Sequence, residues 1–256
     1  MEAELGNGAI AILCVAAFLT AILSAIVGMA GGMTLLSVML LFLPPLAAIP
    51  LHGAIQLASN FSRTLIQREH ARYDLLWYSG WPLLPMGALG LLVAERLPER
   101  ALEATIGSFV LVATWRPKLL ALGARLGGSE RSRFTALGIV CGFLNVTIGA
   151  VGPLTAPFYL NLGLTRQALI GTQAAGQALG HVAKLVLYAG FGFAFREHVA
   201  LLLAAGACAI AGTWVGSRLL ERISERAFTW LYKSVLTGLA LQLVLGAAWA
   251  TLTSRA

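Results

Sequence analysis

Two short glycine-rich stretches decide the fold: residues 28–34 read Gly-Met-Ala-Gly-Gly-Met-Thr, and residues 149–155 read Gly-Ala-Val-Gly-Pro-Leu-Thr. Glycine permits backbone conformations that other residues resist. Pro153 fits the first turn of a helix, where its missing N–H group costs nothing. Each stretch therefore predicts a break in the chain that leads into a short helix.

Both stretches lie in a very apolar sequence of 256 residues, 58% hydrophobic and 11% charged. Typical soluble domains are about 25% charged, so this composition excludes a soluble enzyme, a disordered protein and a disulfide scaffold. Apolar runs such as residues 9–27 and 201–215 predict a helical membrane protein that crosses the bilayer several times. Irregular backbone within a membrane is tolerated only where it is buried in protein or lines a wet cavity. The two breaks therefore mark a candidate site.

The apolar sequence divides into ten segments, five in each half, and the second and seventh segments directly follow the glycine-rich stretches. These two are too short to cross a bilayer as helix alone, because a helix rises only about 1.5 Å per residue. The segments cover residues 9–27, 33–43, 47–67, 75–93, 101–120, 134–148, 154–163, 167–191, 197–219 and 226–250.

The two halves repeat. A shift of 121 residues places residues 28–63 on residues 149–184 without a gap and preserves glycine at two positions, Thr34 as Thr155, and Gln56 as Gln177. Internal repeats of this kind are typical of secondary transporters. We predict an all-α membrane protein built from two inverted five-segment repeats, with broken second and seventh helices. The repeats are expected over residues 1–122 and 134–256, joined by a cytoplasmic linker over residues 123–133.

Basic residues indicate the orientation. If the N-terminus lies outside and every segment crosses, twelve Lys or Arg residues fall on the inner side and four on the outer side. If the two short segments do not cross, the count is nine against six. The positive-inside bias favours the first arrangement, in which five crossings per half invert the second half. We therefore predict a multi-pass protein of the inner membrane with both termini in the periplasm.

The start of each short helix is a candidate anion site, because free N–H groups and the helix dipole attract negative charge there. The inverted repeat would point two such starts at the middle of the membrane from opposite sides. Alternatively, the glycines only let helices pack closely. Two breaks in register favour the anion site, and the substrate contacts expected from it are Gly31, Gly32, Thr34, Gly152 and Thr155.

A polar stripe follows each short helix. Spacings of four, four and three put its members on one helix face, and each stripe ends in a basic residue. Membrane helices avoid such residues unless they face a cavity or a partner helix, and neither stripe contains a carboxylate, so both fit an anion better than a cation. Alternatively, the amides join helices, the histidines are core residues, and the two cations reach to the interface. The stripes are His52, Gln56, Asn60 and Arg63, and then Gln173, Gln177, His181 and Lys184.

Three motifs resemble the TauE/SafE family of sulfite and organosulfonate exporters: Gly-Met-Ala-Gly-Gly from Gly28, Val-Gly-Pro-Leu-Thr-Ala-Pro-Phe over 151–158, and Leu-Gly-Leu-Thr-Arg-Gln-Ala-Leu-Ile-Gly-Thr over 162–172. The likeness covers nearly the whole chain. Two positions depart from the pattern: Pro153 stands where glycine is frequent, and Pro157 has only Leu36 as its counterpart. The resemblance implies that a small sulfur-containing anion moves across the inner membrane, often outward. The residues alone imply a small anion and an inverted repeat.

Other function classes remain open. A drug/metabolite-type exporter also has five plus five helices, but it does not require two glycine breaks. A membrane thiol–electron carrier would use Cys14 and Cys141, which do not share the repeat symmetry. A membrane hydrolase built on Ser59 and His52 lacks any visible oxyanion hole.

We expect no catalytic residue, metal or cofactor, because no zinc spacing, Walker loop or nucleophile elbow occurs in the sequence. The expected partners are the lipid bilayer and the anionic substrate. Nucleic acid is not expected, because the basic residues lie in short loops between apolar runs. Gly212-Thr-Trp-Val-Gly216 has the spacing of a close helix contact, either within one chain or between the subunits of a homodimer.

Overall fold

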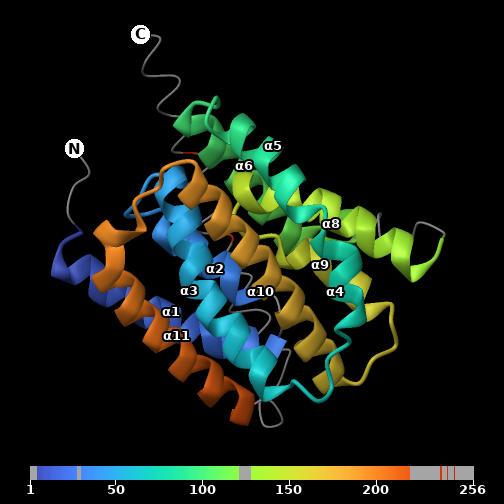
Figure 1. The fold of residues 1–256 in the computed structure, drawn as a ribbon. Helices are drawn as coiled ribbons and strands as arrows, with labels where there is room; N and C mark the ends of the chain where they lie inside the picture. The colour runs from blue at the N-terminus through green and yellow to red at the C-terminus, as the bar shows by residue number, and fades with distance from the viewer. Residues whose placement is uncertain are drawn as a thin grey trace.

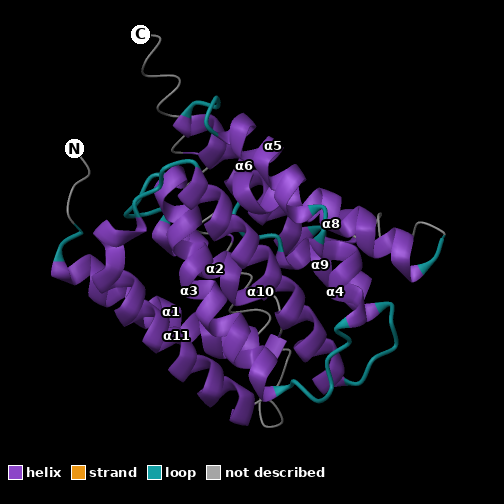
Figure 2. Cartoon of the chain, viewed as in Figure 1, coloured by secondary structure: helices purple, strands orange, loops and turns teal. Residues whose placement is uncertain are grey.

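The computed structural model describes residues 5–27, 30–120 and 128–219, together with positions 237, 241 and 245. Every regular element in these residues is a helix (Figure 2), as the sequence predicts. In chain order the elements are α1 (Asn7–Val27), α2 (Ala30–Met39), α3 (Pro45–Ile66), α4 (Asp74–Gly80), α5 (Leu83–Ala94), α6 (Glu99–Trp115), α7 (Pro117–Leu120), α8 (Glu130–Thr147), α9 (Gly152–Leu160), α10 (Arg166–Gly190), the 3₁₀ helix η2 (Phe195–His198) and α11 (Val199–Leu219).

Nine of the ten predicted segments coincide with described helices, and the tenth, over residues 226–250, lies almost wholly outside the described residues. The fourth segment is divided into α4 and α5 at Pro82, and the fifth into α6 and α7 at Pro117. Proline has no N–H group to continue a helix, which accounts for both divisions. Helix α8 begins inside the predicted linker, because the Ser129 side chain accepts a hydrogen bond from the Ser132 amide and caps the helix.

Three described stretches are long and apolar enough to cross a membrane: Asn7–Ile26, Asp74–Ala94 and Phe195–Leu219. Their outer faces are apolar as well. On α1, Ile12, Val15 and Leu19 are each more than half exposed and stand on one helix face. In water such a face would be unfavourable, whereas lipid tails can cover it.

Helices α3 and α10 form the centre of the bundle and run antiparallel (Figure 1). Near one end of the pair, Gly171 of α10 lies against Gln67, just after α3. Near the other end, the Lys184 side chain lies against Gly53 of α3. Residue numbers therefore rise along α10 while they fall along α3. The polar stripe of each half is carried by one of these two central helices.

Two groups of helices flank the centre. Helix α1 packs along α11 on one side, and α8 packs along α4 and α5 on the other (Figure 1). Glycine makes both contacts close: a Cβ atom at Gly212 would overlap the Phe18 carbonyl oxygen, and one at Gly138 would overlap the Ser79 carbonyl oxygen. The Gly212–Gly216 spacing is therefore a helix contact within one chain.

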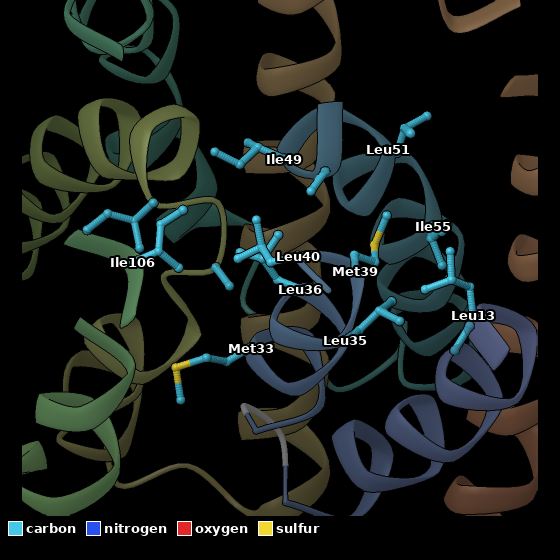
Figure 3. Packing of buried hydrophobic residues seen from close by; sticks show 14 of the residues in the cluster. Leu13, Met33, Leu35, Leu36, Met39, Leu40, Ile49, Leu51, Ile55 and Ile106 are labelled. Atoms are coloured by element: carbon cyan, nitrogen blue, oxygen red, sulfur yellow. The ribbon is translucent and has the colours of Figure 1, made fainter. Parts of the chain in front are cut away.

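The short helix α2 is buried among its neighbours (Figure 3). Leu35 and Met39 point toward Leu13 of α1 and Ile55 of α3, whereas Met33 points away from these residues. All five of these side chains are almost completely buried. Packing on several sides holds a helix that is too short to be stable alone, and it fixes where the first turn of α2 points.

Candidate functional site

A cavity of about 50 Å³ lies where the first turns of α2 and α9 meet α3, α8 and α10. A single water molecule needs a cavity volume of roughly 10–15 Å³ on the same measure, so this cavity has room for a small polyatomic ion. Both short helices contribute first-turn residues to the same cavity. Its lining is Gly32, Met33, His52, Gln56, Ser79, Leu83, Leu137, Gly138, Cys141, Asn145, Ala150, Val151, Gly152, Thr155, Tyr159, Gly176, Gln177, Gly180 and His181.

The second glycine-rich stretch forms the break that the sequence predicts. Residues 148–151 are not helical, and Gly149 has a φ of 89°, a conformation that favours glycine. In the first turn of α9, the Leu154 amide already donates to the Val151 carbonyl oxygen. The leading N–H groups of Val151 and Gly152, by contrast, have no carbonyl partner within the helix. The start of α9 therefore offers hydrogen-bond donors and a positive dipole end to the cavity.

The first turn of α2 lies directly against the polar stripe of α3. The Gly32 carbonyl oxygen is 2.8 Å from Nε2 of His52. A Cβ atom at Gly32 would lie 3.0 Å from the Gln56 amide nitrogen, so glycine permits this close approach. The preceding residues of the first break, Gly28 and Met29, lie outside the described residues.

Four side chains of the two polar stripes line the cavity: His52 and Gln56 from α3, and Gln177 and His181 from α10. The two imidazole rings meet edge to face, with their centroids 5.8 Å apart. The structure gives no hydrogen-bond partner to three buried nitrogen atoms of these residues: Nδ1 of His52, Nε2 of Gln177 and Nδ1 of His181. Buried polar atoms are rarely left unpaired, so these atoms indicate where a ligand or water completes the site.

The two basic residues that end the stripes are buried away from the cavity wall. Nζ of Lys184 donates to the Gly149 carbonyl oxygen at 2.6 Å, and a guanidinium nitrogen of Arg63 donates to the Ser24 carbonyl oxygen at 3.0 Å. Their exposed fractions are 0% and 2%. In the alternative interpretation of the sequence, these cations reach to the membrane interface. They instead donate to carbonyl groups near the ends of α1 and α8.

Other predicted contacts lie behind the cavity wall. A Cβ atom at Gly31 would overlap the Thr20 carbonyl oxygen, so Gly31 serves the packing of α2 on α1. Thr34 is buried but does not line the cavity. On the two central helices, Asn60 accepts from Arg63 at 3.0 Å, and Gln173 donates to the Thr155 hydroxyl at 3.4 Å. Direct contact of these residues with a ligand stays a prediction.

The sequence interpretation missed much of the cavity wall. Tyr159 is one such residue, although it stands on the same face of α9 as the predicted Gly152 and Thr155, at spacings of three and four. That periodicity was the available signal. Its hydroxyl comes close to α10 because Gly176 has no side chain. Asn145 of α8 also lines the cavity, and it donates to the Gly180 carbonyl oxygen at 2.9 Å.

The cysteines do not form the pair that a thiol carrier would use. Cys141 lines the cavity, whereas Cys14 of α1 lies beside Cys208 of α11. All three are free thiols. Within the described ranges, no group of three or more His, Cys, Asp or Glu side chains could hold a metal ion.

Charged residues gather outside the cavity, at the loop between α3 and α4. The Arg72 guanidinium donates to Asp74 at 2.6 Å and to Glu130 at 3.1 Å, and these hydrogen bonds raise the pKa of Arg72. The Arg72 amide donates to the Thr172 hydroxyl at 2.9 Å. Three segments that are distant in sequence therefore meet at one end of the bundle.

The cavity is chemically suited to negative charge. Its polar lining includes helix N-termini, amides and imidazoles, and the Lys184 ammonium lies one helical turn beyond His181. Over residues 5–27, 30–120 and 128–219, no Asp or Glu side chain is buried. A cation would find no carboxylate from these residues at the cavity, whereas an anion would find several donors.

Comparison with known proteins agrees with this chemistry. Residues 13–243 match the family model described as sulfite exporter TauE/SafE. A search of curated proteins and a search of solved structures each gave no match. Because the matched region spans nearly the whole chain, the protein belongs to the TauE/SafE sulfite exporter family.

Proposed function

We propose that this protein is a secondary transporter that moves a small sulfur-containing anion, sulfite or an organosulfonate, outward across the inner membrane by alternating access. The observation that carries the proposal is the cavity at which the first turns of α2 and α9 meet. Gln177 brings an unpartnered amide nitrogen to that cavity, and the buried Lys184 lies one helical turn beyond His181 of the cavity wall. Membership of a family of membrane transporters supports the same conclusion and argues against an enzyme.

We propose further that the chain crosses the membrane ten times, as two inverted repeats over residues 1–122 and 134–256 with both termini in the periplasm. Two observations support this layout. A shift of 121 residues carries the start of α2 to within a residue of α9, and the start of α3 onto that of α10. The repeat-related helices α3 and α10 run antiparallel, as they must if one half is inverted. The meeting of Arg72, Glu130 and Thr172 at one end fits three segments on the cytoplasmic side.

Within this proposal the lining residues have different roles. The N–H groups at the starts of α2 and α9 hold the anionic oxygens, and Gln56 and Gln177 orient the ion with their amide hydrogens. Thr155 places its hydroxyl on the same wall. Lys184 attracts the anion by its positive charge, while its Nζ atom donates a hydrogen bond to the Gly149 carbonyl oxygen. Asn60, Gln173, Thr34 and Arg63 lie behind these lining groups in this structure, and their direct contact with the anion stays a prediction.

Calorimetric binding measurements on the purified protein in detergent test the proposal. Sulfite and methanesulfonate are expected to bind, and acetate more weakly. A hydrogen bond to a charged group contributes about 1.5–3 kcal/mol, so replacing both Gln56 and Gln177 with Ala should lower anion affinity at least about a hundredfold. Ser62→Ala is the matched control, because Ser62 lies on α3 and donates only to the Ala58 carbonyl oxygen of its own helix. Unchanged binding in the double variant would remove the cavity from the transport path.

Two alternative functions are less well supported. A drug/metabolite-type exporter has no need of a break in its seventh helix, yet residues 148–151 interrupt the path from α8 to α9. A thiol–electron carrier needs cysteines close together at one site, yet Cys14 and Cys141 lie on different interfaces. Full transport by a variant with all three cysteines replaced by Ala would exclude the carrier.

A further inference from the structure

We infer that the cavity binds its anion together with one proton, held on Nδ1 of His52. The inference rests on the proposed function and adds the coupling ion. His52 is 1% exposed, lines the cavity and lies in the first stripe of the repeat.

The hydrogen bond to Gly32 fixes which nitrogen of His52 carries hydrogen. A carbonyl oxygen only accepts, so Nε2 must be the donor at 2.8 Å. In the neutral ring the other nitrogen, Nδ1, then has no hydrogen and can only accept. Nδ1 is buried, and the structure gives it no partner. The protein itself therefore supplies no donor to this buried acceptor.

A sulfonate or the sulfite dianion cannot supply that donor, because all of its oxygens are acceptors as well. Two acceptors can meet only if a hydrogen lies between them. Protonation of Nδ1 makes His52 a donor at both nitrogens and turns the mismatch into a charge-assisted hydrogen bond. A permanently ionised sulfonate has no proton of its own to give, so its proton must come from water.

The surrounding charges couple the two events. Lys184 lies one turn from His181 and repels a further positive charge in the empty cavity. An anion offsets this repulsion, so anion and proton each favour the binding of the other, and by the same factor. The titratable side chains that line the cavity together with His52 are His181 of α10, Tyr159 of α9 and Cys141 of α8. The buried cations Lys184 of α10 and Arg63 of α3 lie behind the cavity wall, and α2 carries no titratable side chain.

The transfer step is simple. A proton passes from water on the entry side to Nδ1 of His52 as the anion enters, and it returns to water on the exit side as the anion leaves. No bond within the anion forms or breaks, and no oxidant or reductant takes part. One negative and one positive charge move together, so a sulfonate crosses without net charge.

Proton uptake by the unmodified protein in detergent provides the first test. Methanesulfonate is the probe, because it stays a monoanion over the whole working range of pH. We expect about one proton to be taken up from a weakly buffered indicator solution for each methanesulfonate bound. Affinity should fall about tenfold per pH unit where the free protein is unprotonated. Binding without proton uptake, at an affinity that does not change with pH, would overturn the inference.

Two variants locate the proton. His52→Gln supplies an amide N–H group in place of the imidazole, so it should bind methanesulfonate without proton uptake. His181→Gln is the comparison variant, because His181 lines the same cavity but makes no hydrogen bond to the described residues of α2. Proton uptake that persists in this variant assigns the proton to His52. Uptake that persists in His52→Gln but disappears in His181→Gln would move the proton to His181 and contradict the assignment. Should His52→Gln fail to fold, the proton count on the unmodified protein still decides whether a proton binds.

Failure of the inference is distinguishable from failure of the proposed function. If neither methanesulfonate nor sulfite binds at any pH, the proposed function fails and the inference with it. If sulfite binds and methanesulfonate does not, the count is made at alkaline pH, where sulfite is a dianion and one proton is again expected. Anion binding without a proton leaves the transporter proposal intact and rejects only the coupling.

Discussion

The Lys184 ammonium lies 2.6 Å from the carbonyl oxygen of Gly149, the residue whose positive φ turns the chain from α8 toward α9. Replacing Lys184 with Met keeps most of the side-chain volume but leaves this buried carbonyl without its donor. An unsatisfied buried group costs about 1–3 kcal/mol. We expect Lys184→Met to lower the midpoint of thermal unfolding in detergent and to weaken sulfite binding.

Lys118→Met is the control for that change, because Lys118 is exposed on α7 and its replacement removes the same charge from the surface of the protein. Both variants lower the net charge equally, so any nonspecific effect of charge on anion binding is shared. Equal sulfite affinities in the two variants would contradict a role for Lys184 at the cavity.

Gly149 itself is expected to tolerate no side chain. A left-handed backbone costs a residue with a Cβ atom roughly 1–2 kcal/mol, and that Cβ would lie 2.8 Å from Cδ2 of Leu36. Gly149→Ala should therefore lower the thermal midpoint and disturb the start of α9. Gly8→Ala is the control, because Gly8 is helical with no other atom within 4 Å, so alanine there should be neutral or stabilising. A normal midpoint and normal binding in Gly149→Ala would show that the break is not strained.

Replacing one cavity amide with a carboxylate tests whether the cavity prefers a negatively charged ligand. Gln177→Glu keeps the shape of the side chain and puts a carboxylate in place of an unpartnered amide. Two like charges about 4 Å apart repel by about 4 kcal/mol at an effective dielectric constant near 20. We expect sulfite affinity to fall at least about a hundredfold, with partial recovery at acidic pH as the carboxylate is protonated. Tighter sulfite binding in this variant would contradict an anion site.

The α1–α11 contact makes a prediction about folding. A Cβ atom at Gly212 would overlap the Phe18 carbonyl oxygen, so Gly212→Leu should prevent close packing and destabilise the monomer. The control is Ile210→Leu, because Ile210 is 47% exposed on the same helix. This substitution should change the thermal midpoint little. Thermal unfolding and size-exclusion chromatography measure both variants. If Gly212→Leu keeps a normal thermal midpoint and changes only the oligomeric state, the contact lies at an interface between subunits and not within one chain.

The proposed topology is tested by labelling from outside the cell. In a background in which all three cysteines are replaced by Ala, Glu99→Cys should react with a membrane-impermeant maleimide, because its loop is placed in the periplasm. Glu69→Cys should be protected until the membrane is opened. Both positions are exposed in the structure, so reactivity reports the side of the membrane. The opposite pattern would invert the topology.

The sequence was informative about the short helices and the stripes for a physical reason. Break-forming glycines and polar residues in lipid are both costly, so their repeated occurrence at Gly149, Gln56 and Gln177 carried information that repeated leucines did not. These residues are sufficient to predict α9 and the polar side of the cavity from the sequence alone. The boundary at Ser129 differed because it depends on a capping hydrogen bond that periodicity does not reveal.

The parts that could not be predicted depend on contacts between distant segments. Arg63 and Lys184 are basic and end their stripes, so a surface position was reasonable, but their acceptors are the Ser24 and Gly149 carbonyl groups of other helices. Such acceptors have no signature in a sequence. The apolar part of the cavity wall, including Met33, resembles every other apolar surface of the bundle.

The unequal use of the two stripes has a consequence for the transport cycle. The first half presents its first two stripe positions to the cavity, His52 and Gln56, whereas the second half presents its second and third, Gln177 and His181. Alternating access in an inverted repeat exchanges the conformations of the two halves. In the opposite-facing state the cavity would then be lined by Gln173, Gln177, Gln56 and Asn60, without an imidazole. The site would then face one side of the membrane with a titratable wall and the other side with an amide wall, so its affinity for a proton would differ between the two states of the cycle.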